Sequence, residues 1–415
     1  MKLLWLCNTA PGVVRAHISG KAVSAVNWVD HVLEGLRRRG VRVRILCPGD
    51  GSVGILDEQC SYATFREGLP YIYLPELENR FREAIETIRP DVIHIWGTEY
   101  GHTLAMVNAA EAAGMLAHTA ASIQGLCTFI AGHYAEGIPW KVQRSATFRD
   151  FVRRDAICQQ QKKFARRGAL ETKALQKLHH VIGRTDWDRA CTARLNPKLC
   201  YHFCNETLRE PFYEGEWRYE ACRRHRVFAS SCEYPVKGFH YLLEAFAEVA
   251  GAYPDATLAV TGRTFLPKDL RGRLRRTGYE AYLGKLAKQY GLEDRIEFLG
   301  SLSAAQMKAE FLNANVFAMP STIENSPNSL GEAMLLGVPC VASYVGGAEN
   351  LLENRTEGFL YQSTAAYMLA CHIKKVFAME EGSAALGHAA RSHALHTHDP
   401  ETNLETLMRI YEELA

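Results

Sequence analysis

The sequence lacks the features that would place a protein outside the cell or across a membrane. Its 12 cysteines follow no disulfide framework and include no CxxC pair, and the first apolar run, MKLLWLC, ends at Asn8. So short a run is neither the core of a signal peptide nor a membrane span, and scattered cysteines are typical of a reducing compartment. We therefore expect a cytoplasmic protein.

A pattern of metal ligands is also missing. Cys200 and Cys204 flank His202, which hints at a metal, but no CxxC pair completes a zinc site. The second half of the chain has no DxD-like acidic pair at the end of a strand that could hold Mg²⁺. The sequence therefore predicts no metal site, and cysteines that are mostly buried and inert.

A strong overall charge is the third absence. The formal net charge is +2, yet residues 1–205 carry 27 Lys/Arg against 19 Asp/Glu, whereas residues 206–415 carry 21 against 27. The basic excess lies almost entirely in residues 144–177, where ten basic side chains face three acidic ones. This segment is either a solvated helix face or an acceptor side that meets an anionic acceptor or the anionic inner face of a membrane. Its residues Phe148, Phe151 and Phe164 are expected to face the core.

The chain contains a regular alternation of apolar strand patterns and helical patterns. The predicted strands are 2–7, 41–47, 91–95, 116–123, 179–183, 226–230, 256–261, 295–299, 315–319 and 338–343. The predicted helices between them include 22–39, 102–113, 239–250, 280–290, 303–313 and 329–336. Such alternation predicts an α/β fold with parallel sheets covered on both faces.

The alternation runs twice, so we expect two Rossmann-like domains that face each other across a cleft. The predicted boundaries give domains at 1–205 and 206–398. A final helix at 399–415, capped by Asp399 and started by Pro400, should pack back on the first domain. In α/β folds, ligands bind at the carboxyl ends of the strands.

The stretch STIENSPNSLGEAMLLGVPCVAS places two carboxylates, Glu324 and Glu332, around a loop of small residues and the start of a helix. A helix N-terminus behind such a loop is an anion site. Lys237, at a strand-to-helix turn of the same half, is the candidate cation. The simpler interpretation is that Ser329 and Glu332 have the spacing of a capping box and only start the helix.

These residues carry a resemblance. The second half resembles the retaining glycosyltransferases of the GT-B fold, sequence family four, also called glycosyl transferases group 1. The matching motifs are KG-x(3)-LLEA at 237–245, FLG at 298–300, MPS at 319–321, E-x(7)-E from Glu324 to Glu332, and GG-x-E at 346–349. The first half is similar more loosely, through PDVIHIWG at 90–97 and HVIGRTDWDRA at 180–190.

The resemblance implies a UDP- or GDP-linked sugar as donor, held mainly by the second domain. Glu332 would bind the ribose hydroxyls, Glu324 would face the donor sugar, and Lys237 would neutralise the diphosphate. The base would lie near Leu299–Leu302, beside Gly300. Residues of the second-domain loop and helix would contact the sugar hydroxyls and the phosphates: Asn325, Ser326, Asn328, Ser329 and Leu330. Gly20 and Lys21 of the first domain would reach the phosphates across the cleft.

Two departures from the family pattern stand out. Cys232 occupies the position where the family often has an arginine, which Arg263, Arg15 or Lys21 could replace. Gln124 occupies the position of a frequent histidine, and His133 is the candidate for that catalytic place. Glutamine can hydrogen-bond a sugar but cannot act as acid or base.

The function expected from the sequence is a metal-independent retaining glycosyltransferase that acts on a glycan or lipid-linked acceptor in polysaccharide biosynthesis. Two alternatives remain open. One keeps the fold with a different reaction, as an epimerase or a phosphorylase. The other is a non-catalytic partner in a glycan-assembly complex, which Cys232 and Gln124 favour and the intact Lys237, Glu324 and Glu332 oppose.

Overall fold

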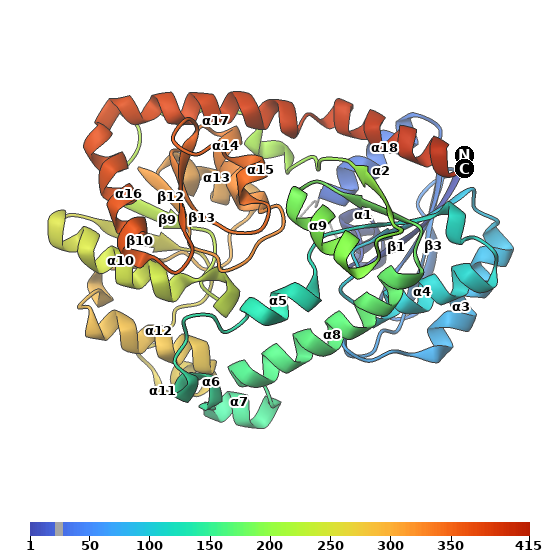
Figure 1. The fold of residues 1–415 in the computed structure, drawn as a ribbon, viewed down its shortest axis with the longest axis horizontal. Helices are drawn as coiled ribbons and strands as arrows, with labels where there is room; N and C mark the ends of the chain where they lie inside the picture. The colour runs from blue at the N-terminus through green and yellow to red at the C-terminus, as the bar shows by residue number, and fades with distance from the viewer. Residues whose placement is uncertain (21–27) are drawn as a thin grey trace. The chain divides into compact units, whose positions relative to one another are not determined.

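The computed structural model describes residues 1–20 and 28–415 (Figure 1). The chain divides into two compact units. Unit 1 comprises Met1–Ala131, Lys163–Arg209 and His398–Ala415. Unit 2 comprises Gly132–Lys162 and Glu210–Thr397.

Unit 1 is built on an eight-stranded sheet with the order β3-β4-β2-β1-β5-β6-β7-β8. Every neighbouring pair is parallel except β3 and β4. The central strand β1 has Leu3 and Trp5 in the core on one face and Leu4 and Leu6 in the core on the other. Both faces are therefore covered. The strands are β1 (Lys2–Cys7), β2 (Arg42–Pro48), β3 (Val53–Ile55), β4 (Cys60–Phe65), β5 (Val92–Trp96), β6 (Thr119–Ser122), β7 (His180–Gly183) and β8 (Cys200–Phe203).

The C-terminal helix α18 (Pro400–Leu414) packs on unit 1, as predicted. Its Asp399 cap accepts a hydrogen bond from the Thr402 amide, and its apolar stripe, with Leu407 and Tyr411, joins the core on the β1 face. The other helices of this unit are α1 (Gly12–Ser19), α2 (Trp28–Arg38), α3 (Pro75–Ile88), α4 (Gly101–Ala112) and α9 (Asp186–Leu195). Helices α5 (Cys127–His133) and α8 (Ile157–Lys177) continue from one unit's sequence into the other's.

Unit 2 contains a six-stranded, wholly parallel sheet with the order β11-β10-β9-β12-β13-β14. The strands are β9 (Arg226–Ala229), β10 (Thr257–Val260), β11 (Ile296–Phe298), β12 (Val316–Met319), β13 (Cys340–Tyr344) and β14 (Gly358–Gln362). The longer helices are α10 (Phe239–Ala252), α12 (Gly278–Gln289), α13 (Ala304–Leu312), α14 (Asn328–Leu335), α16 (Ala366–Met379) and α17 (Ala384–Thr397). Short helices are α6 (Trp140–Arg144), α7 (Phe148–Arg153), α11 (Leu270–Arg275) and α15 (Ala348–Leu351).

The prediction of an α/β fold with two parallel sheets is confirmed, and all ten predicted strands are present within a few residues. The segment Gly132–Lys162 differs from the prediction, because it groups with unit 2 although the sequence placed it in the first domain. Its contacts give the reason: Thr147 Oγ1 donates to the Arg276 carbonyl at 2.7 Å, and Asp150 Oδ2 accepts from the Gly278 amide at 2.6 Å. Among the described residues, no helix is long and apolar enough to cross a membrane.

Candidate functional site

Two turns of unit 2 meet where strands β9 and β12 end. Gly238, in the left-handed region at φ 62°, ends the short turn that carries Lys237, and a Cβ there would lie 1.8 Å from the Pro320 carbonyl oxygen. The Thr322 amide donates to the Val236 carbonyl at 2.8 Å. Because no side chain fits at position 238, only glycine allows the Lys237 turn to approach the β12 loop this closely.

This approach joins Lys237 to Glu324. Lys237 Nζ lies 2.6 Å from Glu324 Oε1, and Ser321 Oγ donates to the same oxygen at 2.8 Å. The side chain of Lys237 is 36% exposed and that of Glu324 is 14% exposed. The two groups, which the sequence assigned to different parts of the donor, therefore form an ion pair.

Helix α14 follows the same loop and presents its N-terminus there. It begins at Asn328, its N-cap is Pro327, and no side chain caps it. Ser329 is therefore a residue of the first turn, and the capping-box interpretation is wrong because Ser329 does not occupy the N-cap. Within the described part of the chain, the Asn328 and Ser329 amides have no hydrogen-bond partner, so they are available to an anion.

The other predicted donor residues lie on the same elements. Glu332 is in the second turn of α14 and is 3% exposed, too deeply buried to be an ordinary surface carboxylate. Asn325 and Leu330 are buried, and Ser326 is half-buried. The Gly346 turn closes on this loop, where a Cβ would lie 1.7 Å from the Glu324 carbonyl oxygen.

A cavity of about 750 Å³, lined by four basic and four acidic side chains, adjoins Gly300. Gly300 has φ 68°, and its carbonyl accepts from the Gly262 amide at 2.9 Å. The sequence analysis named Arg263 here and missed the other basic residues. The cationic side chains in the lining are Arg263, Lys268, Arg275 and Arg276. Arg263 Nη2 lies 3.0 Å from Glu280 Oε1, and its side chain remains 61% exposed.

Cys232 supplies no cation at the position where the family often has arginine. It is 2% exposed, and its Sγ donates to the Thr261 carbonyl at 3.6 Å. Burial raises the pKa of this thiol to about 12, so it stays neutral.

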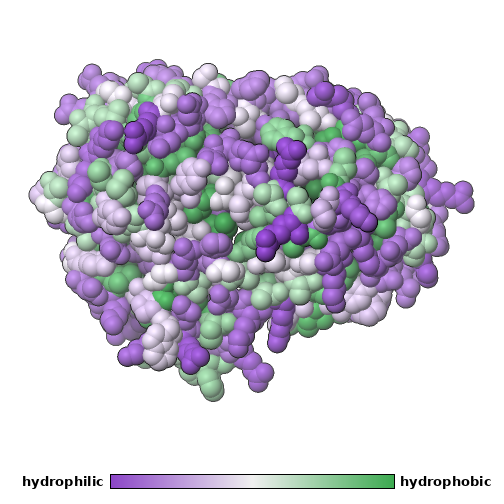
Figure 2. Space-filling model, viewed as in Figure 1, coloured by the Kyte–Doolittle hydropathy of each residue, from purple (hydrophilic) through white to green (hydrophobic). Residues whose placement is uncertain are grey.

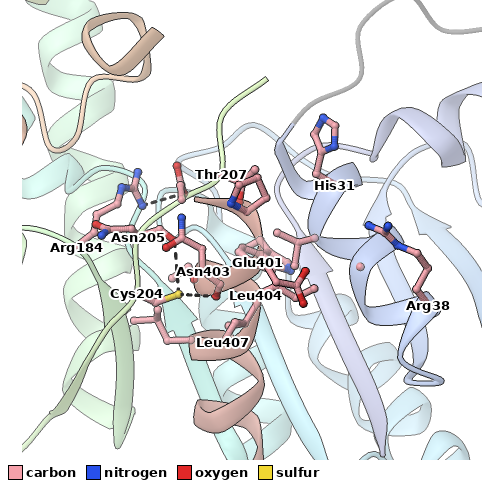
Figure 3. Close-up of a pocket in the computed structure, with 17 residues that line it drawn as sticks. His31, Arg38, Arg184, Cys204, Asn205, Thr207, Glu401, Asn403, Leu404 and Leu407 are labelled. Carbon is pink, nitrogen blue, oxygen red and sulfur yellow. Dashed lines mark hydrogen bonds and ion pairs between the residues drawn. The ribbon is translucent and has the colours of Figure 1, made fainter. Parts of the chain in front are cut away.

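Gln124 belongs to a polar cluster of unit 1. Its Nε2 donates to Glu206 Oε1 at 2.6 Å, and Arg184 Nη1 lies 2.8 Å from the same oxygen. Arg184 and Glu206 also line a cavity of about 100 Å³. Figure 3 shows Arg184, Cys204 and Asn205 on one side of this cavity, Arg38 and His31 on the other, and α18 side chains between them. The hydrogen bond to Glu206, which Arg184 also contacts, fixes the orientation of the Gln124 side chain.

His133 belongs to unit 2, whereas Gln124 belongs to unit 1. Its ring is exposed and its Nδ1 lies 2.8 Å from Glu136 Oε2, while its carbonyl accepts from Thr322 Oγ1 at 3.1 Å. The structure therefore connects His133 to the Glu324 loop, two residues before Glu324. Gly20 is the left-handed C-cap of α1, and Lys21 lies outside the described residues.

Unit 1 also holds two acidic residues that were not predicted from the sequence, the half-buried Glu99 just after β5 and the buried Glu171 of α8. Asn8 Nδ2 donates to Glu99 Oε2 at 2.7 Å, and Thr98 Oγ1 donates to Glu171 Oε1 at 2.7 Å. Burial raises the pKa of Glu99, and it raises that of Glu171 to about 8. The position of Glu99 just after PDVIHIWG was the available signal, since strand ends carry ligands in such sheets.

The basic segment 144–177 is only partly solvated. Arg149 Nη1 contacts Asp150 and Asp155, Lys177 contacts Glu111, and Arg167 lies over the Tyr100 ring. The prediction that Phe148 and Phe151 face the core is wrong. On their helix, α7, Asp150 is the buried residue, and it accepts a hydrogen bond from the first residue of α12. The rings of Phe148 and Phe151 lie on the outer side of α7 and are 65% and 79% exposed.

Residues 227–393 match the family model described as Glycosyl transferases group 1. This segment of the chain belongs to that family. It contains Lys237, Glu324 and Glu332, so the ion pair and α14 lie inside the group 1 segment.

Part of the chain is also similar in sequence to individual curated proteins. The GDP-mannose-dependent alpha-(1-6)-phosphatidylinositol monomannoside mannosyltransferase of Mycolicibacterium smegmatis is 29% identical over 169 residues, which are 39% of this chain and 41% of that protein. The chain spans less than half the length of the curated relatives it matches.

Solved structures are similar over the whole chain. Sucrose-phosphate synthase from Thermosynechococcus elongatus has a TM-score of 0.72 at 17% identity, covering 100% of this chain and 99% of that one. Anabaena HepE in complex with UDP-glucose has a TM-score of 0.67 at 18% identity, covering 99% of each chain. These likenesses confirm the predicted GT-B fold.

Proposed function

We propose that the protein is a retaining glycosyltransferase that moves a sugar from a nucleotide-sugar donor to an acceptor without a metal ion in the donor site. The observation that supports the proposal most is the meeting of Lys237, Glu324 and the uncapped start of α14 inside the group 1 segment. A cation and free amides at one point suit a diphosphate, and a carboxylate beside them suits the hydroxyls of a sugar.

The leaving group would be stabilised by the chain itself. As the bond from the sugar to the diphosphate breaks, the new charge on the phosphate oxygen is met by Lys237 and by the Asn328 and Ser329 amides. The acceptor hydroxyl would attack from the same face and give its proton to that phosphate oxygen. Glu324 is a poor nucleophile here, because its Oε1 already accepts from Ser321 and Lys237.

The donor class can be tested with the whole chain. HepE was solved with UDP-glucose, and the name of the mycobacterial relative specifies GDP-mannose, so UDP and GDP are the first nucleotides to compare, with ADP as a third. A nucleotide at about 100 times its dissociation constant should add about 2.7 kcal/mol to the free energy of unfolding. NMR of the transferred or hydrolysed sugar then reports the anomer, and the inverted anomer as first product would contradict retention.

The buried Cys232 favours one second candidate, a non-catalytic partner in a glycan-assembly complex. Such a protein could bind a nucleotide but would neither hydrolyse nor transfer the sugar. Donor turnover on purified protein decides between the two candidates, and nucleotide binding without any turnover across the donor panel would favour the partner.

We further propose that the acceptor is lipid-linked and is met at an anionic membrane surface. Trp140, Phe148, Phe151 and Val152 are all at least 63% exposed on α6 and α7. Lys141 and Arg144 lie over the Trp140 ring. In Figure 2, hydrophobic side chains stand beside hydrophilic ones at the lower end, where Figure 1 draws these two helices. Exposed aromatic rings beside basic side chains suit the interface of an anionic bilayer.

Flotation with liposomes tests this surface. The Phe148→Ser/Phe151→Ser variant and a charge variant with exposed Arg153, Arg154, Lys162 and Arg166 changed to Glu should both lose salt-sensitive binding to anionic vesicles. Tyr367→Ser, at another 63% exposed aromatic of unit 2, is the matched control. Equal flotation of all variants, or none by the wild type while it acts on a free acceptor, would contradict the membrane proposal.

A further inference from the structure

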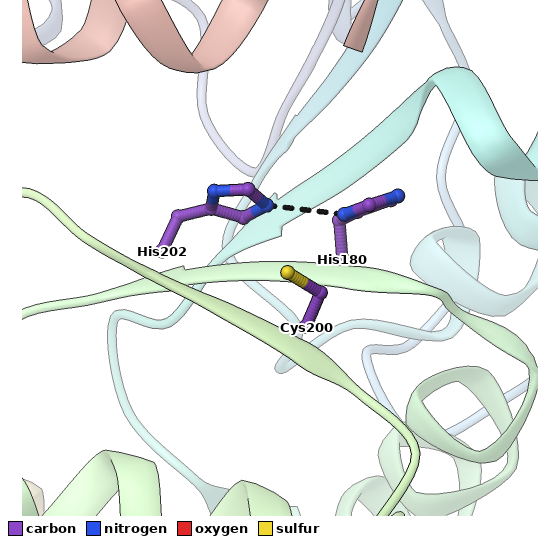
Figure 4. Close-up of side chains that lie close together, drawn as sticks. All are labelled: His180, Cys200 and His202. Carbon is purple, nitrogen blue, oxygen red and sulfur yellow. Dashed lines mark hydrogen bonds between the residues drawn. The ribbon is translucent and has the colours of Figure 1, made fainter. Parts of the chain in front are cut away.

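Three potential metal ligands meet at the edge of the unit 1 sheet. Strand β8 is the last strand of that sheet and pairs in parallel with β7, with His180 opposite Cys200. His202 follows Cys200 by two residues and therefore projects from the same face of β8. Figure 4 shows the two imidazole rings pointing toward each other, with the Cys200 sulfur beside them.

The distances suit a small divalent cation. His180 Nδ1 and His202 Nε2 are 3.0 Å apart, and the potential ligand atoms of the three residues all lie within 4.8 Å of one another. A tetrahedral zinc ion, with bonds of about 2.0–2.1 Å to nitrogen and about 2.3 Å to sulfur, separates its ligand atoms by roughly 3.3–3.6 Å. Small side-chain adjustments would therefore complete the site.

A carboxylate stands behind one of the rings. Glu413 Oε2, on α18, lies 3.6 Å from His202 Nδ1. An Nδ1–H directed at this carboxylate leaves the Nε2 lone pair pointing at His180, which is the arrangement that orients histidines at metal sites. His180 Nδ1–H then donates to His202 Nε2, and metal binding would shift that proton to His180 Nε2.

The sequence places both Cys200 and Cys204 beside His202, and the structure retains only Cys200 as a potential ligand. Cys204 is 8% exposed, and its Sγ donates to the Asn403 carbonyl at 3.6 Å. Cys200, in contrast, is exposed.

We propose that His180, Cys200 and His202 bind a borderline-soft divalent cation of the zinc type, with Glu413 orienting His202 and one position left for water. Binding would replace the thiol proton of Cys200 and release it, so that one proton leaves for each cation bound. The cation would link edge strand β8 to β7 and, through Glu413, to α18. This site is separate from the donor site in unit 2 and does not depend on the proposed transfer reaction.

The test uses the full chain without a histidine tag, stripped of metal and titrated with Zn²⁺ alone against a chromophoric chelator. One equivalent should bind, and calorimetry in buffers of different ionisation enthalpy should report one proton released. Cys200→Ser and His202→Gln should each weaken binding by at least about tenfold, and Glu413→Gln by about 10–100-fold. Cys371→Ser, at the exposed cysteine of unit 2, is the matched control and should bind as the wild type does.

Cobalt gives a second readout that a merely structural change would not produce. Co²⁺ bound to the wild type and to Cys371→Ser should show a thiolate-to-cobalt charge-transfer band, which Cys200→Ser should lack. Far-UV circular dichroism checks that each variant is folded. Folded wild type that binds no Zn²⁺, or Cys200→Ser and His202→Gln variants that bind it like the wild type, would overturn the proposal.

Discussion

Because Lys237 and Glu324 form an ion pair, substitutions of the two residues should change nucleotide affinity differently. Lys237 Nζ has a carboxylate at 2.6 Å, so a diphosphate would have to share or replace that partner. Lys237→Ala should weaken UDP or GDP binding, because the phosphate loses its cation. Glu324→Gln should leave nucleotide affinity equal or higher, because it removes the competing negative charge, yet turnover should fall if Glu324 contacts the donor sugar.

The exposure of the Lys237–Glu324 ion pair sets the expected changes in the free energy of nucleotide binding. A charge-assisted bond to phosphate contributes about 1.5–3 kcal/mol, and a pair as exposed as this one contributes about 1 kcal/mol after solvent screening. Lys237→Ala should therefore cost about 0.5–2 kcal/mol in nucleotide binding, or roughly twofold to thirtyfold. Glu324→Gln should tighten binding by no more than about fivefold.

Titration calorimetry with UDP and GDP measures these changes, with turnover followed separately. Lys374→Ala is the matched control, because Lys374 Nζ lies 3.5 Å from Glu248 Oε2 with a side chain that is 34% exposed. The reasoning is refuted if Glu324→Gln weakens nucleotide binding as much as Lys237→Ala while both variants keep the wild-type melting temperature.

Three further outcomes are expected. Glu332→Gln should lower donor affinity by about 10–100-fold with the protein still folded; a lower melting temperature with unchanged affinity would limit Glu332 to a structural role. EDTA should leave the turnover of a Cys200→Ser variant, which lacks the proposed zinc thiolate, nearly unchanged, and loss of turnover restored by Mg²⁺ would contradict a metal-free donor site. Because burial raises the pKa of Glu171 to about 8, the folded state holds a proton that the unfolded state releases near pH 4.5, so stability should fall as pH rises from about 4.5 to 8, by up to about 1.4 kcal/mol per unit. Urea unfolding at pH 6 and pH 8 should show a smaller difference for Glu171→Gln, and an identical difference would contradict the assignment.

The sequence predicted the sheets well, because buried parallel strands form continuous apolar runs such as KLLWLC in β1. It missed β3, β4, β8 and β14, and for β3 and β8 the reason is the exposure of their residues. Strand β3 has two exposed residues of three, and β8 exposes Cys200 and Phe203, so neither shows the pattern of a buried strand.

The candidate site was predictable as a set of residue types and not as a set of contacts. The spacing from Glu324 to Glu332 and the turn at Lys237 were visible in the sequence. Their ion pair depends on two loops separated by more than eighty residues, brought together at Gly238. The positions of Phe148 and Phe151 also depended on a distant partner, because Asp150 turns inward to meet Gly278.

The interleaving of the units has a consequence for genetic dissection of the protein. The chain passes from one unit to the other four times, so neither unit is a contiguous stretch of sequence. A fragment cut at 210 and 397 would contain the group 1 segment but would leave the start of α12 without the buried carboxylate of Asp150. Residues 132–162 would have to be joined to that fragment by a linker or added as a separate peptide, so complementation between two polypeptides becomes the natural way to study the half that contains the group 1 segment.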